Sequence, residues 1–140
     1  MIIKSTNTDL LSNNRDYQLF LSQNPSRGTL KVRASSVNEA LPISNVKVVV
    51  SKKIGNDTII FFEGQTDNSG MINGIKLPTP RKIQNNEEVP IFTEYDLEAT
   101  YEPSNFYKKY GISLCCGITI IQYINIIPEV NYEMRNYNGY

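Results

Sequence analysis

The chain has 140 residues, of which 40% are hydrophobic, and its 14 Lys and Arg balance its 14 Asp and Glu to a net charge of zero. This length fits one domain with a hydrophobic core, and the balanced charge, without a basic run, lacks the electrostatic footprint of a nucleic-acid binder, so we expect no nucleic-acid partner. The chain contains no histidine, which excludes Ser-His and Cys-His catalysis and leaves only two adjacent cysteines and carboxylates for zinc, so we expect neither metal nor cofactor.

No hydrophobic run approaches the roughly 20 residues that a membrane-spanning helix needs. The first 14 residues, MIIKSTNTDLLSNN, lack the charged start, long apolar centre and cleavage site of a signal peptide. We therefore expect a protein that is made in the cytosol without a signal peptide and has no membrane partner.

Residues 1–27 are rich in Asn, Ser, Thr and Asp around one hydrophobic cluster, formed by Tyr17, Leu19, Phe20 and Leu21. Composition favours a flexible N-terminal arm. The alternative is a short strand over residues 16–23 that adds to the sheet of a neighbouring copy, which would make the arm an assembly device.

Residues 29–50 predict two strands joined by a proline turn. Leu30, Val32 and Ala34 alternate with polar residues, and the valines that follow Pro42 do the same. A period of two puts one face of each strand against a core, and Pro42 cannot donate to a ladder.

A hairpin is predicted at Gly55-Asn56-Asp57, because turn-forming residues separate two β-prone runs. The second run, residues 58–62, is hydrophobic on both faces. Strict alternation puts Ile59 and Phe61 in the core and leaves Ile60 and Phe62 for another cover, either a tail or a partner.

Residues 66–70, TDNSG, predict a compact turn in which Asp67 accepts backbone hydrogen bonds and Gly70 adopts a positive φ. Calcium is the less favoured interpretation, since it takes six to eight oxygen ligands. The polar loop at residues 81–90 is expected at the surface.

In the strand predicted for residues 106–116, Cys116 shares the core face with Ile112 and Leu114. Cys115 then points outward, as an inert thiol or as half of an intermolecular disulfide.

Pro128 ends the last strand, and the tail contains three tyrosines that either stay in solvent or dock on a neighbour: Tyr132, Tyr137 and Tyr140.

The candidate strands predict an all-β, seven-stranded antiparallel sandwich with extended N- and C-terminal arms. They cover residues 30–35, 46–51, 58–62, 71–77, 91–101, 106–116 and 118–127.

Residues 28–128 resemble the carboxypeptidase regulatory-like, transthyretin-like β-sandwich found in spore-forming Firmicutes. The resemblance rests on GTLKVRA at 28–34, PISNVKVVV at 42–50, TDNSG at 66–70, IKLPTP at 75–80 and the closing GITIIQYINIIPE. It implies a Greek-key (prealbumin-like) topology and a module that accompanies peptidoglycan hydrolases or wall-binding domains without being catalytic. The domain is then 28–128, with an arm at 1–27 and a tail at 129–140.

The leading functional hypothesis is therefore a non-enzymatic structural subunit that self-assembles through its arms, as a homo-oligomer or filament, in a spore coat, a spore appendage or a similar surface structure. Its contacts would be made by Tyr17, Leu19, Phe20, Leu21, Ile60, Phe62, Tyr132, Tyr137 and Tyr140, with a possible intermolecular disulfide at Cys115.

The competing hypothesis is an accessory module that docks a peptidoglycan hydrolase or a cell-wall glycan, with Tyr101, Tyr107 and Tyr110 stacking on sugars. A less favoured alternative is an internal isopeptide bond between Lys31 and Asn125, promoted by Glu98. Such a bond needs a dry site, and alternation turns all three side chains away from the core.

Overall fold

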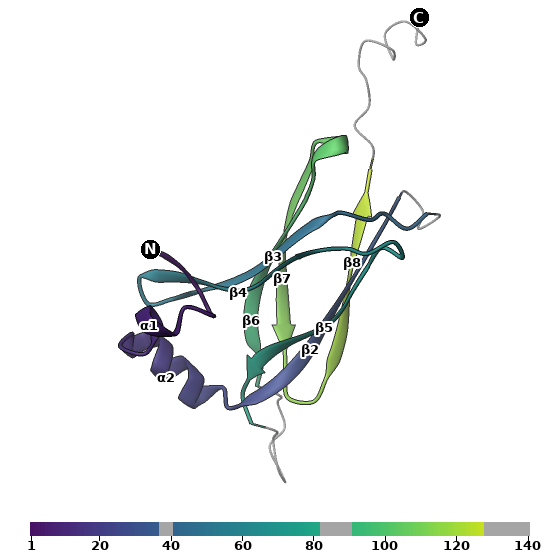
Figure 1. The fold of residues 1–140 in the computed structure, drawn as a ribbon. Helices are drawn as coiled ribbons and strands as arrows, with labels where there is room; N and C mark the ends of the chain where they lie inside the picture. Colours follow the sequence, from purple (N-terminus) through teal and green to yellow (C-terminus); the bar gives the residue numbers. More distant parts are fainter. Residues whose placement is uncertain (37–40, 82–90, 128–140) are drawn as a thin grey trace, which may run out of the picture.

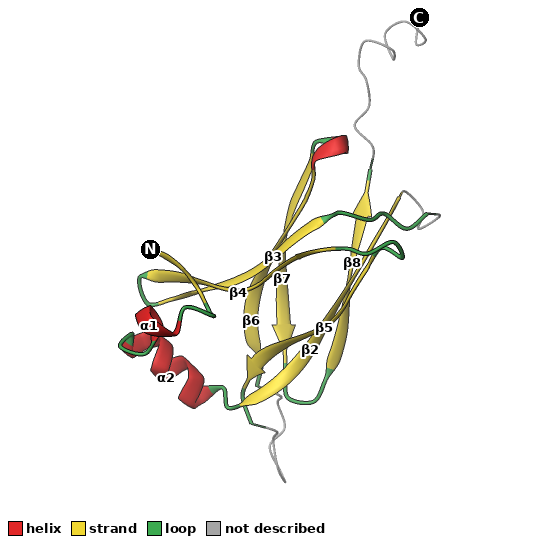
Figure 2. Cartoon of the chain, in the orientation of Figure 1, coloured by secondary structure: helices red, strands yellow, loops and turns green. Residues whose placement is uncertain are grey.

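The computed structural model describes residues 1–36, 41–81 and 91–127. Within them the chain forms two packed β-sheets with two short helices at one end (Figures 1 and 2). The elements in order are β1 (Ile2–Lys4), α1 (Thr8–Leu11), α2 (Arg15–Gln23), β2 (Ser26–Ser36), β3 (Lys47–Ile54), β4 (Asp57–Gln65), β5 (Met71–Thr79), β6 (Thr93–Tyr101), a 3-10 turn (Glu102–Ser104), β7 (Phe106–Leu114) and β8 (Thr119–Ile126).

The sandwich predicted from alternation is confirmed, and β2 to β8 correspond to the predicted strands. The first sheet has the order β1-β4-β3-β6-β7, and the second has the order β5-β2-β8. Two details differ from the prediction. The structure adds β1, and the pairs β1–β4 and β2–β8 are parallel.

The two strands on either side of Pro42, β2 and β3, do not pair with each other. β2 lies in the three-stranded sheet and β3 in the five-stranded sheet, so the connection crosses from one layer to the other. After β2 has ended, Pro42 makes an isolated antiparallel bridge back to Ser35 of that strand. Alternation located both strands here, but it carries no information about which sheet each one joins.

The core lies between the sheets, where the alternating residues meet. β2 contributes Leu30, Val32 and Ala34, and β3 contributes Val48 and Val50, all fully buried. At roughly 25 cal/mol per Å² of apolar surface, burial of such side chains is the main force that joins the two layers.

The N-terminal segment, expected to be an arm or a strand, instead forms α1 and α2 and packs on the sandwich. Asn14 caps α2, since its Oδ1 accepts a hydrogen bond from the Tyr17 amide at 3.0 Å. Asn14 Nδ2 also donates to Asp57 Oδ2 at 3.0 Å, which ties the helix to the β3–β4 hairpin. The side of α2 that carries Tyr17 and Phe20 is therefore buried.

Both predicted turns are confirmed. The β3–β4 hairpin turns at Gly55, where φ is 62°. In the 66–70 turn Asp67 Oδ1 accepts hydrogen bonds from the amides of Ser69 and Met71, each at 2.9 Å, and Gly70 has a φ of 73°. None of the helices among the described residues is long and apolar enough to cross a membrane.

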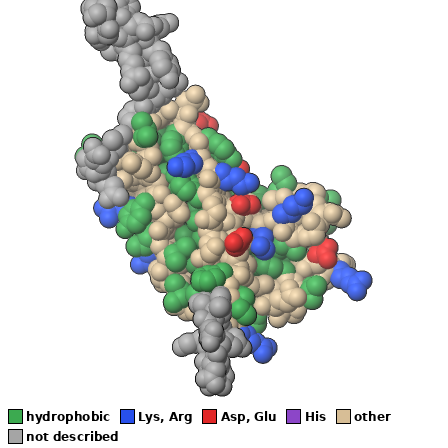
Figure 3. All heavy atoms as spheres, turned by 180° about the vertical axis from the view of Figure 1, so that it is seen from behind, with side chains coloured by type: hydrophobic (Ala, Val, Ile, Leu, Met, Phe, Trp, Pro, Cys, Tyr) green, Lys and Arg blue, Asp and Glu red, His purple; other side chains and the backbone are tan. Residues whose placement is uncertain are grey.

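The surface carries a mixture of side-chain types. Seen from behind, acidic and basic side chains lie close together beside a band of hydrophobic side chains (Figure 3). Three ion pairs are formed within the described residues, among them Lys4 with Glu63 at 3.2 Å and Lys109 with Asp96 at 3.9 Å.

Candidate functional site

The N-terminal residues expected to make assembly contacts belong mainly to the core. Phe20 is 7% exposed and Tyr17 is 8% exposed. Leu21 is half-buried against the same core, and only Leu19 faces solvent, at 55% exposure. These contacts are intramolecular, so the prediction of an exposed arm anchored by this cluster is wrong.

Phe62 was expected on the outer face of β4, but it packs against the core. The pairing of β3 with β4 contains a bulge, because Val50 faces Phe62 while the next residue, Ser51, faces Ile60. The extra residue on β4, Phe61, shifts the alternation by one position. Phe61 and Phe62 both pack against the core, and Ile60 stays half-buried.

Cys116 was expected in the core, and it is not there. β7 ends at Leu114, and both cysteines lie in the connection to β8, half-exposed and with free thiols. Gly117 follows with a φ of 74°, which lets the chain reverse immediately after them.

Tyr132, Tyr137 and Tyr140 lie outside the described residues, as does most of the 81–90 loop.

The residues considered for an isopeptide bond are not brought together. Lys31 and Asn125 lie on β2 and β8 of the three-stranded sheet, whereas Glu98 lies on β6 of the other sheet. Glu98 Oε1 instead accepts a hydrogen bond from the Tyr107 hydroxyl at 2.6 Å. Tyr107 is therefore held on the outer surface of the five-stranded sheet.

The structure contains a candidate site that none of these predictions included, at a split in the five-stranded sheet. β3 and β6 pair as far as Ser51 and Asp96, and there their ladder stops. β3 nevertheless continues to Ile54 alongside β4, and β6 begins at Thr93 alongside β7. The end of β3 and the start of β6 are therefore not paired with each other, which leaves a gap in the sheet.

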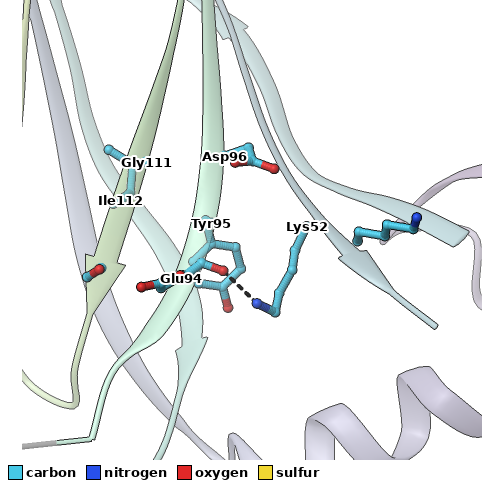
Figure 4. Close-up of a pocket in the computed structure, with 8 residues that line it drawn as sticks. Lys52, Glu94, Tyr95, Asp96, Gly111 and Ile112 are labelled. Atoms are coloured by element: carbon cyan, nitrogen blue, oxygen red, sulfur yellow. Dashed lines mark hydrogen bonds between the residues drawn. The ribbon is translucent and has the colours of Figure 1, made fainter. Parts of the chain in front are cut away.

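Lys52 bridges this gap. Its Nζ donates a hydrogen bond to the Glu94 carbonyl oxygen at 2.7 Å, so one side chain replaces the missing ladder bonds (Figure 4). The ammonium group lies 5.8 Å from the centroid of the Tyr95 ring and 6.0 Å from that of the Phe20 ring. Both distances are in the range of cation–π attraction, which holds the charge between the two rings.

The aromatic rings around Lys52 are fixed by their own contacts. Phe61 lies 5.3 Å from Tyr95 in an edge-on arrangement and 5.9 Å from Phe20. The Tyr95 hydroxyl donates to the Pro78 carbonyl oxygen at 2.5 Å, and burial raises the pKa of this hydroxyl far above its ordinary value. The site is thus preorganised on one side by packed rings and a neutral phenol.

Two clefts meet at Lys52. The first, about 460 Å³, is mainly polar and lies toward β7, lined by Lys52, Lys53, Glu94, Tyr95, Asp96, Gly111, Ile112 and Ser113. The second, about 560 Å³, lies toward α2, and its lining includes four hydrophobic residues: Phe20, Pro80, Ile91 and Phe92. Both volumes are in the range of small-molecule sites, roughly 300 to 1,000 Å³.

The charged groups of the polar cleft are nearly balanced. Its lining contains two cations, Lys52 and Lys53, and two carboxylates, Glu94 and Asp96, and Asp96 is also paired with Lys109 at 3.9 Å. The donor set does not suit a metal, since within the described residues no three acidic or cysteine side chains gather. The chemistry available is ammonium binding, a carboxylate pair and the Ser113 hydroxyl.

The chain is similar to known proteins in structure but not in sequence. No family model and no curated protein matches the sequence. Among solved structures, the 5-hydroxyisourate hydrolase of Klebsiella pneumoniae superimposes with a TM-score of 0.51 at 17% sequence identity, over 72% of this chain and 90% of that chain.

This finding corrects the functional expectation drawn from the sequence. The neighbour is an enzyme, so a sandwich of this kind does not indicate a non-enzymatic subunit or accessory module. The burial of Tyr17, Phe20 and Phe62 also removes residues on which the assembly hypothesis depended. What the comparison establishes for this chain is a transthyretin-like fold.

Proposed function

We propose that the chain binds a small organic anion in the paired clefts at Lys52. The observation that carries this proposal is the position of the ammonium group, on the border between a polar cleft and a hydrophobic one. An ammonium has three N–H donors, and the Glu94 carbonyl uses one of them. The other donors can bind an anionic group, while Ile91 and Phe92, both about half exposed, offer surface to a flat or apolar body.

Hydrolysis of the bound molecule is the second candidate function. It is supported by the fold that the chain shares with a hydrolase, and by the Glu94 and Asp96 carboxylates in the cleft that contains Lys52. A carboxylate pair can supply a general base and a general acid without histidine. Lys52 would then hold the anionic edge of the substrate beside these carboxylates.

The binding proposal is tested by calorimetry with 3-phenylpropionate, which carries a carboxylate and a phenyl ring, against 3-phenylpropanol, which lacks the charge. We expect the acid to bind at least about tenfold more tightly than the alcohol, because a charge-assisted hydrogen bond contributes about 1.5 to 3 kcal/mol. Lys52→Met should abolish this preference. Lys47→Met, an exposed change on the same strand outside the clefts, should leave it intact.

Equal affinity for both compounds, or an unchanged preference in Lys52→Met, would overturn the binding proposal. Hydrolysis is followed separately as the loss of 5-hydroxyisourate above the rate in buffer. Glu94→Gln should reduce any such rate by about 100-fold, the typical contribution of an acid–base group. If 3-phenylpropionate binds as expected but 5-hydroxyisourate is not hydrolysed, the anion-binding proposal is supported and hydrolysis of that substrate is excluded.

Two finer predictions from the sequence remain proposals. One is membership of the carboxypeptidase regulatory-like domains of spore-forming Firmicutes, for which the resemblance of residues 28–128 is the support. The other is association with further copies of the chain, which sedimentation velocity over a range of concentrations would test.

A further inference from the structure

Within the described residues, one edge of the three-stranded sheet, β8, has no strand beside it. β8 pairs with β2 on one side, and no strand of the described chain pairs with it on the other (Figure 1). Its sequence, TIIQYINI, contains no charged residue, no proline and no glycine. Native proteins normally protect a long edge strand with such residues, because its free N–H and C=O groups pair readily with another strand.

The other sheet edges are all protected. β1 has only three residues, and β7 carries Lys108, Lys109 and Gly111. β5 contains Pro78 and a kink at Gly74, where φ is 72° and its register with β2 shifts. The exposed backbone of β8 is therefore a property of this edge and not of the fold in general.

The charged residues on the strands of this sheet are all basic. The three strands of this sheet carry four cations, Arg27, Lys31, Arg33 and Lys76, and no acidic residue. None of these cations forms an ion pair within the described residues. This contrasts with the five-stranded sheet, which carries both acidic and basic residues, among them the cross-strand pair of Glu98 and Lys109.

The register brings the cations next to the exposed residues of β8. Lys31 pairs with Ile121, and Arg33 pairs with Tyr123, all on the outer face of the sheet. Ile121 is 45% exposed and Tyr123 is 46% exposed. A strand added to β8 would lie about 4.8 Å beyond it. Its outward side chains would flank Ile121 and Tyr123, within reach of the long side chains from β2.

We propose that β8 binds an extended acidic peptide segment of a partner protein as a fourth strand of this sheet. The backbone edge supplies main-chain hydrogen bonds, the usual source of affinity in strand addition. Lys31 and Arg33 select acidic side chains at alternate positions of the peptide. Ile121 and Tyr123 pack against the aliphatic parts of those peptide side chains. Nucleic acid fits less well, since it lacks the regularly spaced main-chain donors and acceptors that would continue a ladder along β8.

The test uses the full chain and a fluorescein-labelled peptide of four Val-Glu repeats, with four Val-Lys repeats as the charge control. Fluorescence anisotropy should show binding of the acidic peptide only. Arg33→Glu and Ile121→Glu should each weaken it at least about tenfold, because like charges then face each other. Lys47→Glu makes the same charge change as Arg33→Glu on the other sheet and should leave affinity within about twofold.

Hydrogen exchange locates the contact. Bound peptide should slow exchange of amides in residues 119–126 and leave those of β7 unchanged. Equal binding of both peptides, protection elsewhere than β8, or unchanged affinity in Arg33→Glu would overturn the proposal. So would tighter binding of a labelled 20-nucleotide oligo-dT than of the acidic peptide. The folding of each variant is checked by its urea midpoint.

Discussion

At the scale of single residues, Lys52 and Tyr95 each donate a side-chain hydrogen bond to a backbone carbonyl oxygen. Lys52 closes the split between β3 and β6 through the Glu94 carbonyl. Tyr95 joins the two sheets, since it lies on β6 and donates to Pro78 of β5. Both residues lie just beyond the point where β3 and β6 stop pairing. The Lys52 ammonium and the Tyr95 hydroxyl donate to carbonyl oxygens that a strand neighbour would otherwise have to satisfy.

Tyr95→Phe should lower the free energy of unfolding at pH 7 by about 1 to 3 kcal/mol, because the buried Pro78 carbonyl then lacks its donor. The phenol also gives stability a pH dependence. Burial raises its pKa in the folded state, so the unfolded chain releases the proton first, at about pH 10. The stability contributed by Tyr95 is thus full below pH 10 and is lost as pH rises through the folded pKa.

Urea unfolding from pH 7 to 11 checks both parts. The native chain should lose stability above pH 10, and Tyr95→Phe should lose less over the same interval. Tyr123→Phe is the matched control, since the Tyr123 side chain is 46% exposed. A Tyr95→Phe curve parallel to that of the native chain would contradict the assignment.

At the scale of elements, the N-terminal helices complete the core that the second sheet leaves open. The five-stranded sheet extends beyond the three-stranded one, and α2 covers this end of its inner face (Figure 2). Phe20 and Tyr17 of α2 contact Phe61 of β4, with ring centroids 5.9 and 6.3 Å apart. The helix therefore acts as a third layer over one end of the sandwich.

Phe20→Ala should lower the free energy of unfolding by about 3 kcal/mol, since it removes a buried ring and leaves a cavity beside Phe61. Leu19→Ala, on the exposed side of the same helix, should change it by less than about 0.5 kcal/mol. Chemical denaturation of both variants gives the comparison. Equal effects would mean that α2 does not pack on the sheet through this side.

The sequence contains a signal for this helix that the strand interpretation overlooked. Tyr17, Phe20 and Leu21 recur at the spacing of a helix face, Asn14 is a favourable cap, and Asp16 lies in the first turn. A polar composition obscured this pattern. The β-bulge at Phe61 has no comparable signal, because it depends on how two strands align and not on either one alone.

At the scale of the whole molecule, alternation predicted the sandwich because burial of every second side chain is a local pattern that survives in the fold. It could not predict the candidate site, which depends on where the β3–β6 ladder ends. Lys52 and Glu94 lie 42 residues apart in the chain and meet only across that gap. A lysine and a glutamate are both ordinary residues at the end of a strand, so neither one marks a site in the sequence.

A chain that begins at Pro25 provides the test of whether the N-terminal segment belongs to the domain. Removal of residues 1–24 takes away β1, α1 and α2, and with them the buried side chains of Ile3, Leu11 and Phe20. At about 1.5 to 3 kcal/mol for each buried side chain, we expect a loss of several kcal/mol. The urea midpoint should fall, and the slope of the transition should decrease because less surface becomes exposed on unfolding. The uncovered face around Phe61 should also bind a hydrophobic dye. An unchanged midpoint would mean that the sheets are stable without their helical layer, and that the segment is an appendage after all.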